Sequence, residues 1–352
     1  MTSMMLTIKL RLKDKHAVEL SRQAGAVNYV WNYCNETQQK AARAQRKWLN
    51  WVDLERLTAG TSKDLNLHSH TIQQVCIQYD RSRQQHKKAW LRFRGRKSLG
   101  WVPFNQGHVT IVETGKIKFR GVVYEAMHWR ALSSGTVIHA GSFNQDNKGH
   151  WYVNMPVEIP VSAAQSDRMA VGIDLGLKDL ATLSTGEKIE APRYYRRHEQ
   201  RLAKAQRANK KRLIRAISAK IANCRKDHLH KASARIALVH DVIFVGNVSS
   251  KKLARTKMAK SVLDAGWFTF RTQLSYKALR HGGRCIEVNE AYTSQTCSAC
   301  GSMPEGRPKG IAGLEVRQWE CEDCGVSHDR DVNAALNIVR RGLATLAEGA
   351  GA

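Results

Sequence analysis

Four cysteines arranged as two close pairs constrain this chain more than any other feature of its sequence. Cys297 and Cys300 form one CxxC segment, Cys321 and Cys324 form a second, and twenty residues separate the pairs. Each pair is followed directly by a glycine, which suits a sharp turn. Zn²⁺ prefers four thiolates in a tetrahedron, and two CxxC turns supply them. We therefore expect one zinc ion, and four cysteine ligands leave it no open position for catalysis.

The alternatives for these cysteines are two disulfides or a redox dithiol. The basic, cytoplasmic character of the chain argues against both, because disulfides rarely persist in the reducing cytoplasm. The chain has 57 Lys and Arg against 30 Asp and Glu, a formal net charge of +27. Such a charge indicates a polyanionic partner, with nucleic acid first and an anionic membrane surface second. No apolar run approaches the roughly 20 residues that span a bilayer, and the first residues do not resemble a signal peptide. We therefore expect a cytoplasmic protein without a membrane partner.

The 352 residues predict a multidomain α+β protein. Residues 1–166 combine alternating, strand-like runs with a helical insert at about 16–95. The polar stretch 160–168 is a plausible linker. Residues 167–352 then follow the order β-β-α-β-α-β-α, which indicates a mixed sheet flanked by helices. The predicted elements of this part are a hairpin at 169–190, helices at 193–240 and 253–280, strands at 242–248 and 284–292, and a closing helix at 328–349.

Two aspartates occupy positions that call for an explanation. Asp174 interrupts an apolar strand, VGIDLG, where a carboxylate is costly unless it is paired or bound to metal. Asp331 begins the closing helix in HDRDVNAALNI, close to Asp329, and either residue suits a helix cap. Taken alone, each aspartate fits a structural role. Together with the two CxxC pairs, they form a combination that one known family shares.

The chain resembles the TnpB proteins, insertion-sequence relatives of the type V CRISPR effector nucleases. The resemblance covers essentially the whole chain and is most specific in its second half. The segments that carry it are GIDLGLKDLATLSTGE (172–187), AYTSQTCSACG (291–301), WECEDCG (319–325) and HDRDVNAALNI (328–338), with weaker matches at VNYVWNYCNE (27–36) and KKAWLRFRGRKSLGWVPF (87–104).

This resemblance implies an N-terminal β-barrel-like wedge domain with a helical recognition insert. It also implies a C-terminal RNase H-like (RuvC) domain with a zinc ribbon at about 293–327. In such a domain, three carboxylates surround two Mg²⁺ ions that assist phosphodiester hydrolysis. The first and last carboxylates of the family correspond to Asp174 and Asp331. The implied partners are a guide RNA and a double-stranded target DNA, with a short motif read by the protein and the rest by base pairing.

The middle carboxylate departs from the family, which usually has Glu at the end of the strand VIFVGN. Here Gly246 and Asn247 stand in its place. One explanation is an inactive site, leaving an RNA-guided DNA binder that acts as a repressor. The other is that Glu290, at the end of the next strand, has taken over the position. We prefer the second, because neighbouring parallel strands lie about 4.8 Å apart and Gly246 leaves room. Glu287 is expected on the opposite face.

Two further segments predict contacts with nucleic acid. Residues 193–235 contain 15 Lys or Arg but only two acidic residues, Glu199 and Asp227. This imbalance fits a duplex held by its phosphates. Trp90 and Phe93 lie among basic residues, where they either stack on unpaired bases or pack into the core.

The preferred interpretation is thus an Mg-dependent, RNA-guided DNA endonuclease encoded by a transposable element. A nuclease-dead binder is the main alternative. A DNA-strand transferase is a weaker one, since no Tyr or Ser recombinase signature is evident. The sequence predicts no oligomeric state.

Overall fold

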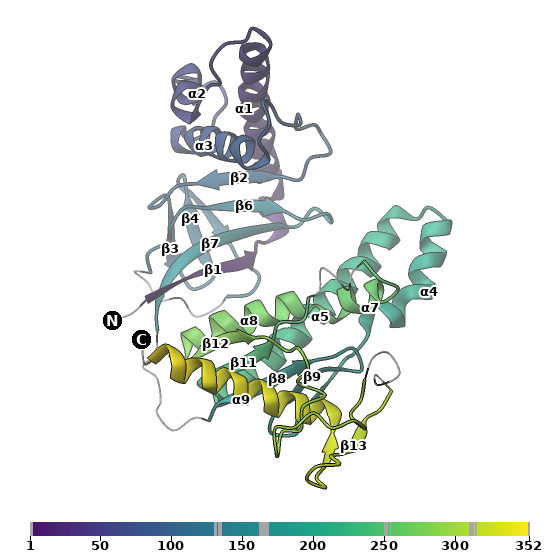
Figure 1. The fold of residues 1–352 in the computed structure, drawn as a ribbon. Coiled ribbons are helices and arrows are strands. Elements are labelled where there is room, and N and C mark those ends of the chain that lie inside the picture. Colours follow the sequence, from purple (N-terminus) through teal and green to yellow (C-terminus); the bar gives the residue numbers. More distant parts are fainter. Residues whose placement is uncertain are drawn as a thin grey trace. The chain divides into compact units, whose positions relative to one another are not determined.

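The computed structural model describes residues 3–129, 132, 136–161, 169–249, 253, 255–309, 313 and 315–350. The chain divides into two compact units, residues 3–159 and residues 160–352 (Figure 1). The predicted boundary between residues 166 and 167, and most of the predicted linker, lie outside the described residues. Within the described part, no helix is both long and apolar enough to cross a bilayer.

The first unit is built on two antiparallel sheets. One has the order β1-β7-β6-β2 and the other the order β3-β4-β5. Their inward-facing side chains share one core, which includes Phe104, Phe119 and Phe143. The strands are β1 (Ser3–Arg11), β2 (Trp101–Phe104), β3 (Val109–Glu113), β4 (Lys116–Phe119), β5 (Val122–Glu125), β6 (Gly141–Gln145) and β7 (Trp151–Pro160).

Between β1 and β2 the chain forms a helical insert. After a short 3₁₀ turn (Asp14–His16), it contains α1 (Ala17–Arg43), α2 (Trp51–Thr58) and α3 (Ser69–His86). These helices enclose a second core around Trp31, Tyr79 and Cys76. The insert thus has a core of its own, while the first turns of α1 pack on the sheets through Leu20 and Ala24.

The second unit contains a five-stranded sheet in the order β10-β9-β8-β11-β12. The strands β8, β11 and β12 are parallel to one another, whereas β9 is antiparallel to both of its neighbours. A separate two-stranded sheet pairs β13 with β14. The strands are β8 (Val171–Leu175), β9 (Asp179–Leu183), β10 (Lys188–Glu190), β11 (Val242–Gly246), β12 (Arg284–Val288), β13 (Gln318–Glu320) and β14 (Ser327–Asp329).

Helices cover both faces of the five-stranded sheet, because its central strands are apolar on both sides. Ile243 and Val245 face the core formed with α5 and α8, whereas Phe244 faces α9. The helices are α4 (Tyr194–Arg207), α5 (Lys211–Val239), α7 (Ala259–Ala265), α8 (Trp267–Arg280) and α9 (Arg330–Ala350). Figure 1 shows α9, in yellow, running along the strands labelled β8 and β11.

Two small residues allow α9 to lie directly on the sheet. A Cβ at Gly172 of β8 would overlap the backbone carbonyl of Ala335 in α9, and one at Gly342 would overlap the ring of Phe244. This close packing explains Gly172, the first glycine of the GIDLG segment. The packing also brings the start of α9, which carries Asp331, towards the end of the sheet where β8 finishes.

The structure corrects two predicted boundaries. The segment 169–190 forms three strands rather than a two-stranded hairpin. The predicted strand 284–292 ends at Val288, so Glu290 lies in the turn beyond it. The turn begins because the Asn289 side chain accepts a hydrogen bond from the backbone of Ala291, which competes with strand pairing.

Candidate functional site

The four cysteines of the two CxxC segments come together at one point. The Sγ atoms of Cys297 and Cys324 lie 3.7 Å apart, and those of Cys300 and Cys321 lie 3.8 Å apart. A tetrahedral zinc ion with bonds of about 2.3 Å places its sulfurs about 3.8 Å apart. All four sulfurs lie within 4.8 Å of one another, and none is in a disulfide. The cluster is thus shaped to hold one metal ion.

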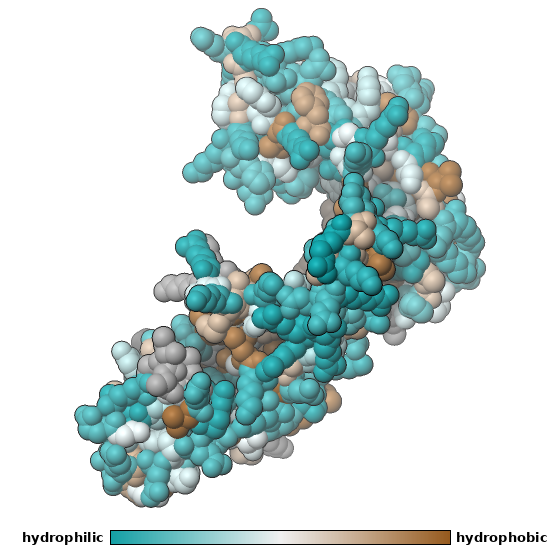
Figure 2. All heavy atoms as spheres, turned by 90° about the vertical axis from the view of Figure 1, so that its right-hand side faces the viewer, coloured by the Kyte–Doolittle hydropathy of each residue, from teal (hydrophilic) through white to brown (hydrophobic). Residues whose placement is uncertain are grey.

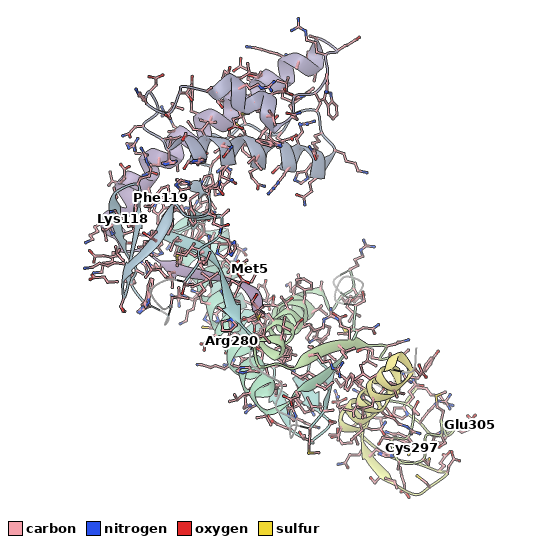
Figure 3. The ribbon with its side chains drawn as sticks, turned by 90° about the vertical axis from the view of Figure 1, so that its left-hand side faces the viewer. Met5, Lys118, Phe119, Arg280, Cys297 and Glu305 are labelled. Atoms are coloured by element: carbon pink, nitrogen blue, oxygen red, sulfur yellow. The ribbon has the colours of Figure 1, made fainter. Side chains whose placement is uncertain are left out.

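Helix α9 holds the first of these CxxC turns through two asparagines. Asn333 and Asn337 each donate hydrogen bonds to the backbone carbonyls of Thr293 and Thr296. Asn333 also accepts one from the backbone of Ser298. Figure 3 shows Cys297 close to this helix. The motif NAALN therefore fixes the cysteine cluster to the helix that carries Asp331.

A histidine that the sequence did not single out also contacts this cluster. His328 Nε2 lies 3.0 Å from the Sγ atom of Cys297, and its ring packs on Trp319. His328 is in β14, directly before the start of α9. Its place within HDRD, next to an acidic motif, was the only signal available in the sequence.

Asp174 projects from β8 near the carboxyl end of that strand. Burial, followed by the negative charges of Asp331 and Glu290, raises its pKa from 3.8 to about 7, against the opposing positive charge of Arg330. The charged form of Asp174 is thus unfavourable in the metal-free protein. The electrostatic influence of both other acids places the three predicted carboxylates in one neighbourhood.

Asp331 and Asp329 have different roles in the structure. The Asp329 carboxylate accepts hydrogen bonds from the backbone N–H groups of Asp331 and Val332, which makes it the cap of α9. Asp331 is therefore free of that task. Its carboxylate is instead held by Arg317 at 3.0 Å and by Arg330 at 3.0 Å. Sequence reasoning overlooked both arginines, although Arg330 stands directly before Asp331 in the chain.

Glu290 lies over Gly246. A Cβ added at Gly246 would overlap Glu290 Oε2 and lie 3.3 Å from its Cβ. Burial raises the pKa of Glu290, against a hydrogen bond from the backbone of Val248 and the positive charge of Arg271. Its Oε2 atom is buried and has no hydrogen-bond partner. By contrast, Glu287 is largely exposed and pairs with Arg271 at 3.1 Å.

These three carboxylates form a wider group than the cysteines. Among the described residues, the four cysteines are the only set of three or more potential ligands within 4.8 Å of one another. The buried Oε2 atom of Glu290 has no partner, and the nearby Asp174 carboxyl has a raised pKa. A divalent cation would fit here, because it would give the Glu290 oxygen a partner and favour the ionised form of Asp174. Oxygen donors of this kind suit Mg²⁺.

The predicted nucleic-acid segments are exposed. The 15 basic residues between 193 and 235 lie on α4, α5 and their flanks, and hydrophilic side chains dominate the face of the molecule in Figure 2. Trp90 and Phe93 are 40% and 48% exposed, so they do not serve as core residues. Their segment is fixed to α1, because Asn35 and Asn32 bond the backbones of Leu91 and Arg94.

Two family models match consecutive parts of the chain from residue 154 to residue 338. Residues 154–257 match the OrfB_IS605 model, described as "Probable transposase". Residues 267–338 match the model "Cas12f1-like, TNB domain". The first covers the strands that carry Asp174 and Gly246. The second covers Glu290, the cysteine cluster and Asp331.

Whole-chain relatives agree with these models. A protein of Streptomyces pristinaespiralis named "Putative RNA-guided DNA endonuclease" is 31% identical over 96% of this chain and 89% of its own length. InsQ of Escherichia coli K12, which bears the same description, is 27% identical over 97% and 92%. In fold, the chain is similar to Cas12f1 in a solved complex with guide RNA and target DNA, with a TM-score of 0.59, 12% identity, and 96% and 99% of the two chains covered. With a relative this similar along nearly its full length, the chain belongs to the TnpB family.

Proposed function

We propose that this protein is an RNA-guided DNA endonuclease whose second unit is an RNase H-like (RuvC) domain that cuts DNA with a relocated glutamate. The observation that carries the proposal is the position of Glu290 over Gly246. The carboxylate missing from β11 is replaced by one that approaches the same space from the turn after β12. An inactive site would not require a buried, unpartnered glutamate there.

Asp174, Glu290 and Asp331 would together hold two Mg²⁺ ions, which supply an activated water and charge neutralisation for phosphodiester hydrolysis. The chain's own residues prepare this site. The Asp174 carboxyl, with its pKa raised to about 7 by burial and by its acidic neighbours, is destabilised as a free anion and so favours a cation beside it. Arg317 and Arg330 orient the carboxylate of Asp331.

The cysteine cluster would hold one structural Zn²⁺ and form a zinc ribbon. Its β13–β14 hairpin positions Arg317 just before β13 and leads from β14 directly into α9. The ribbon therefore contributes to the carboxylate site by fixing Arg317 and Asp331, without taking part in hydrolysis.

The first unit would act as a wedge domain with its helical recognition insert, in the cytoplasm of a prokaryote. The formal net charge of +27 supports a guide RNA and a double-stranded target DNA as partners. Protein purified from cells that express the neighbouring DNA should contain one dominant RNA encoded beside the gene. A random mixture of cellular RNA would contradict the guide hypothesis.

The decisive experiment replaces Glu290 by Gln in the purified complex with its co-expressed RNA. With matched DNA and Mg²⁺, wild-type protein should cut, whereas Glu290→Gln should lose about a thousandfold or more in rate while still binding RNA and DNA. Gln keeps the shape but removes the charge that the metal ions need.

Glu287→Gln is the matched control, because Glu287 is exposed and pairs with Arg271 rather than with the site. It should cut like the wild type. If Glu290→Gln also cuts like the wild type, the relocation is wrong. If the wild type binds its target without cutting, the nuclease-dead binder is the better description.

A further inference from the structure

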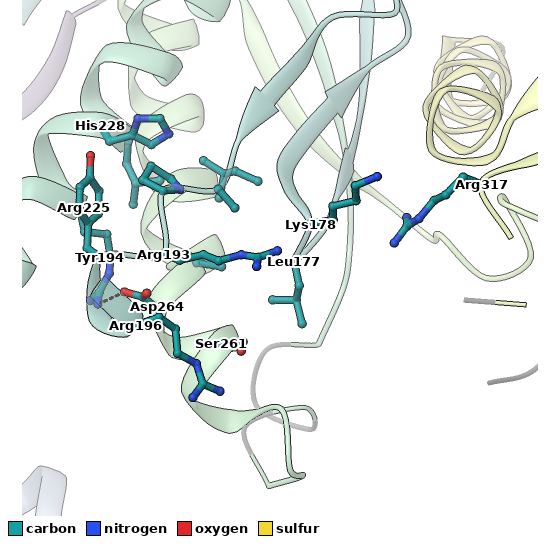
Figure 4. A pocket seen from close by; sticks show the side chains of 15 residues that line it. Leu177, Lys178, Arg193, Tyr194, Arg196, Arg225, His228, Ser261, Asp264 and Arg317 are labelled. Carbon is teal, nitrogen blue, oxygen red and sulfur yellow. Dashed lines mark hydrogen bonds and ion pairs between the residues drawn. The ribbon is translucent and has the colours of Figure 1, made fainter. Parts of the chain in front are cut away.

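A basic pocket of about 540 Å³ opens beside the carboxylate site in the second unit. Its walls come from the β8–β9 turn, the start of α4, α5, α7 and the segment before β13. Figure 4 shows Lys178 and Arg193 extending from these walls toward Arg317. Arg317 connects the two sites, since its other contact is the carboxylate of Asp331 at 3.0 Å.

The pocket contains more positive charge than its acidic residue can balance. Five cationic side chains line it, together with one carboxylate, Asp264. That carboxylate is already engaged by Arg225 at 2.6 Å and by the backbone of Tyr195 at 2.8 Å. In the described part of the chain, no ion pair joins Lys178 or Arg193 to an acidic group. These two cations are therefore available for an anion.

Two further features point to a ligand. The Nε atom of Arg225 is buried without a hydrogen-bond partner, whereas Nη2 of the same guanidinium pairs with Asp264. Arg193 has a φ of 52°, a left-handed conformation that is costly for a side chain with a Cβ. No helix-capping hydrogen bond from the Arg193 side chain explains this conformation. Strain of this kind is often retained where it directs a side chain into a binding site.

We propose that this pocket holds a nucleotide of a single DNA strand, with its phosphate against Lys178 and Arg193 and its base against the apolar wall of Leu177, Pro192 and Leu229. A cavity of this volume admits a small-molecule-sized group and excludes a duplex. Because Arg317 also contacts Asp331, the bound nucleotide fixes which phosphodiester of the strand reaches the carboxylates. This assignment rests on the proposed nuclease function.

Binding of a fluorescent short oligothymidylate tests the pocket directly. The purified protein–RNA complex is titrated without Mg²⁺, and anisotropy is measured. The double substitution Lys178→Gln with Arg193→Gln should weaken binding by roughly tenfold or more, because each contact between a charged group and a phosphate contributes substantially. Melting temperature checks that the variant is folded.

The matched control is Lys204→Gln with Arg207→Gln, which removes two exposed cations of α4 that do not line the pocket. It should change binding by less than about twofold. Equal weakening by both double variants would overturn the assignment, and so would tighter binding of an oligouridylate than of the DNA probe. A probe carrying 5-iododeoxyuridine should also cross-link to Tyr194, and cross-links only elsewhere would contradict the site.

The two proposals can fail separately. If the wild type does not cut matched DNA but the pocket variant still loses the probe, the pocket stands and the nuclease function fails. If the wild type cuts and the pocket variant cuts at the same positions and rate and binds the probe equally well, the pocket assignment alone is wrong.

Discussion

The cysteine cluster and the carboxylate cluster both involve residues of helix α9, yet they are built in contrasting ways. The cysteines come from two short segments, and their sulfurs already stand 3.7 to 3.8 Å apart. The carboxylates come from three distant segments. Burial of Asp174 and repulsion by Asp331 and Glu290 together raise the pKa of Asp174 to about 7. One site has a geometry that can hold a metal ion. The other concentrates unfavourable charge, as functional sites commonly do.

The same contrast holds for the backbone. Each CxxC turn is followed by a glycine at positive φ, Gly301 at 82° and Gly325 at 71°, where glycine has no steric penalty. The pocket beside the carboxylates instead has Arg193 at 52°. Local preference and structure agree in the ribbon and disagree near the carboxylates. Such disagreements are expected where function, rather than stability, selects the residue.

The largest effect should follow from breaking the cysteine cluster. Cys321→Ser leaves three ligands, and we expect the loss of bound zinc and of roughly 5 kcal/mol or more of the ribbon's folding free energy. Elemental analysis and thermal melting measure both. Cys224→Ser, on α5 and outside the cluster, is the control and should retain zinc. Folded protein without zinc, before any substitution, would contradict the metal assignment.

How far the sequence predicts each site follows from the same difference. The cysteine cluster can be predicted from the sequence because local spacing fixes its ligands. Asp174 and Asp331 can be predicted from their motifs, and the parallel pairing of β11 with β12 makes Glu290 a reasonable candidate. Whether these three carboxylates bind metal and cut DNA stays a prediction.

Other features were not predictable because they depend on side-chain directions across long separations. Asp329 rather than Asp331 caps α9, and Arg317 reaches Asp331 from another segment. The pocket required the β8–β9 turn, α4, α5 and α7 to be placed together. Strand β12 ends two residues before Glu290 because the Asn289 side chain starts a turn, a local competition that alternation of apolar residues does not reveal.

Removing the buried charge of Asp174, and with it the repulsion by Asp331 and Glu290, should stabilise the metal-free protein. The folded pKa of Asp174 is raised, so the native state holds its proton up to about pH 7, while the unfolded state loses it near 3.8. Stability is therefore lost as pH rises from about 4 to about 7. In EDTA at pH 8, Asp174→Asn should gain up to roughly 4 kcal/mol, and clearly less at pH 5.

Melting temperatures at the two pH values measure this gain. Glu287→Gln, which changes an exposed carboxylate, should show no comparable pH-dependent gain. An Asp174→Asn variant that is less stable than the wild type at pH 8 would contradict the unfavourable burial and repulsion of the Asp174 charge. Saturating Mg²⁺ should narrow the difference, because only the wild type gains from binding.

A single methyl group should disturb the relocated carboxylate. The Cβ of Gly246→Ala would overlap Glu290 Oε2, the mobile end of a side chain that can swing away. We expect cleavage to slow by roughly tenfold to a hundredfold, about 1.4 to 2.7 kcal/mol, with little change in melting temperature. Gly25→Ala, in open space on α1, is the control. Gly246→Glu combined with Glu290→Ala should recover part of the activity, and unchanged cleavage in Gly246→Ala would separate Glu290 from catalysis.

The smallest effect concerns Arg193 and isolates backbone strain from side-chain function. Glycine adopts the left-handed conformation without strain, so we expect Arg193→Gly to be more stable than Arg193→Ala by about 0.5 to 1 kcal/mol. In an ordinary helix or strand the order is reversed, because glycine there is less stable than alanine by about the same amount. Both variants should bind the oligothymidylate equally weakly. Asn209, at a φ of 48° between α4 and α5, is the comparison, because asparagine tolerates this conformation and Asn209→Gly should gain less. If Arg193→Gly is no more stable than Arg193→Ala, the arginine is not strained. The carboxylate side of the unit would then match the relaxed backbone of the ribbon.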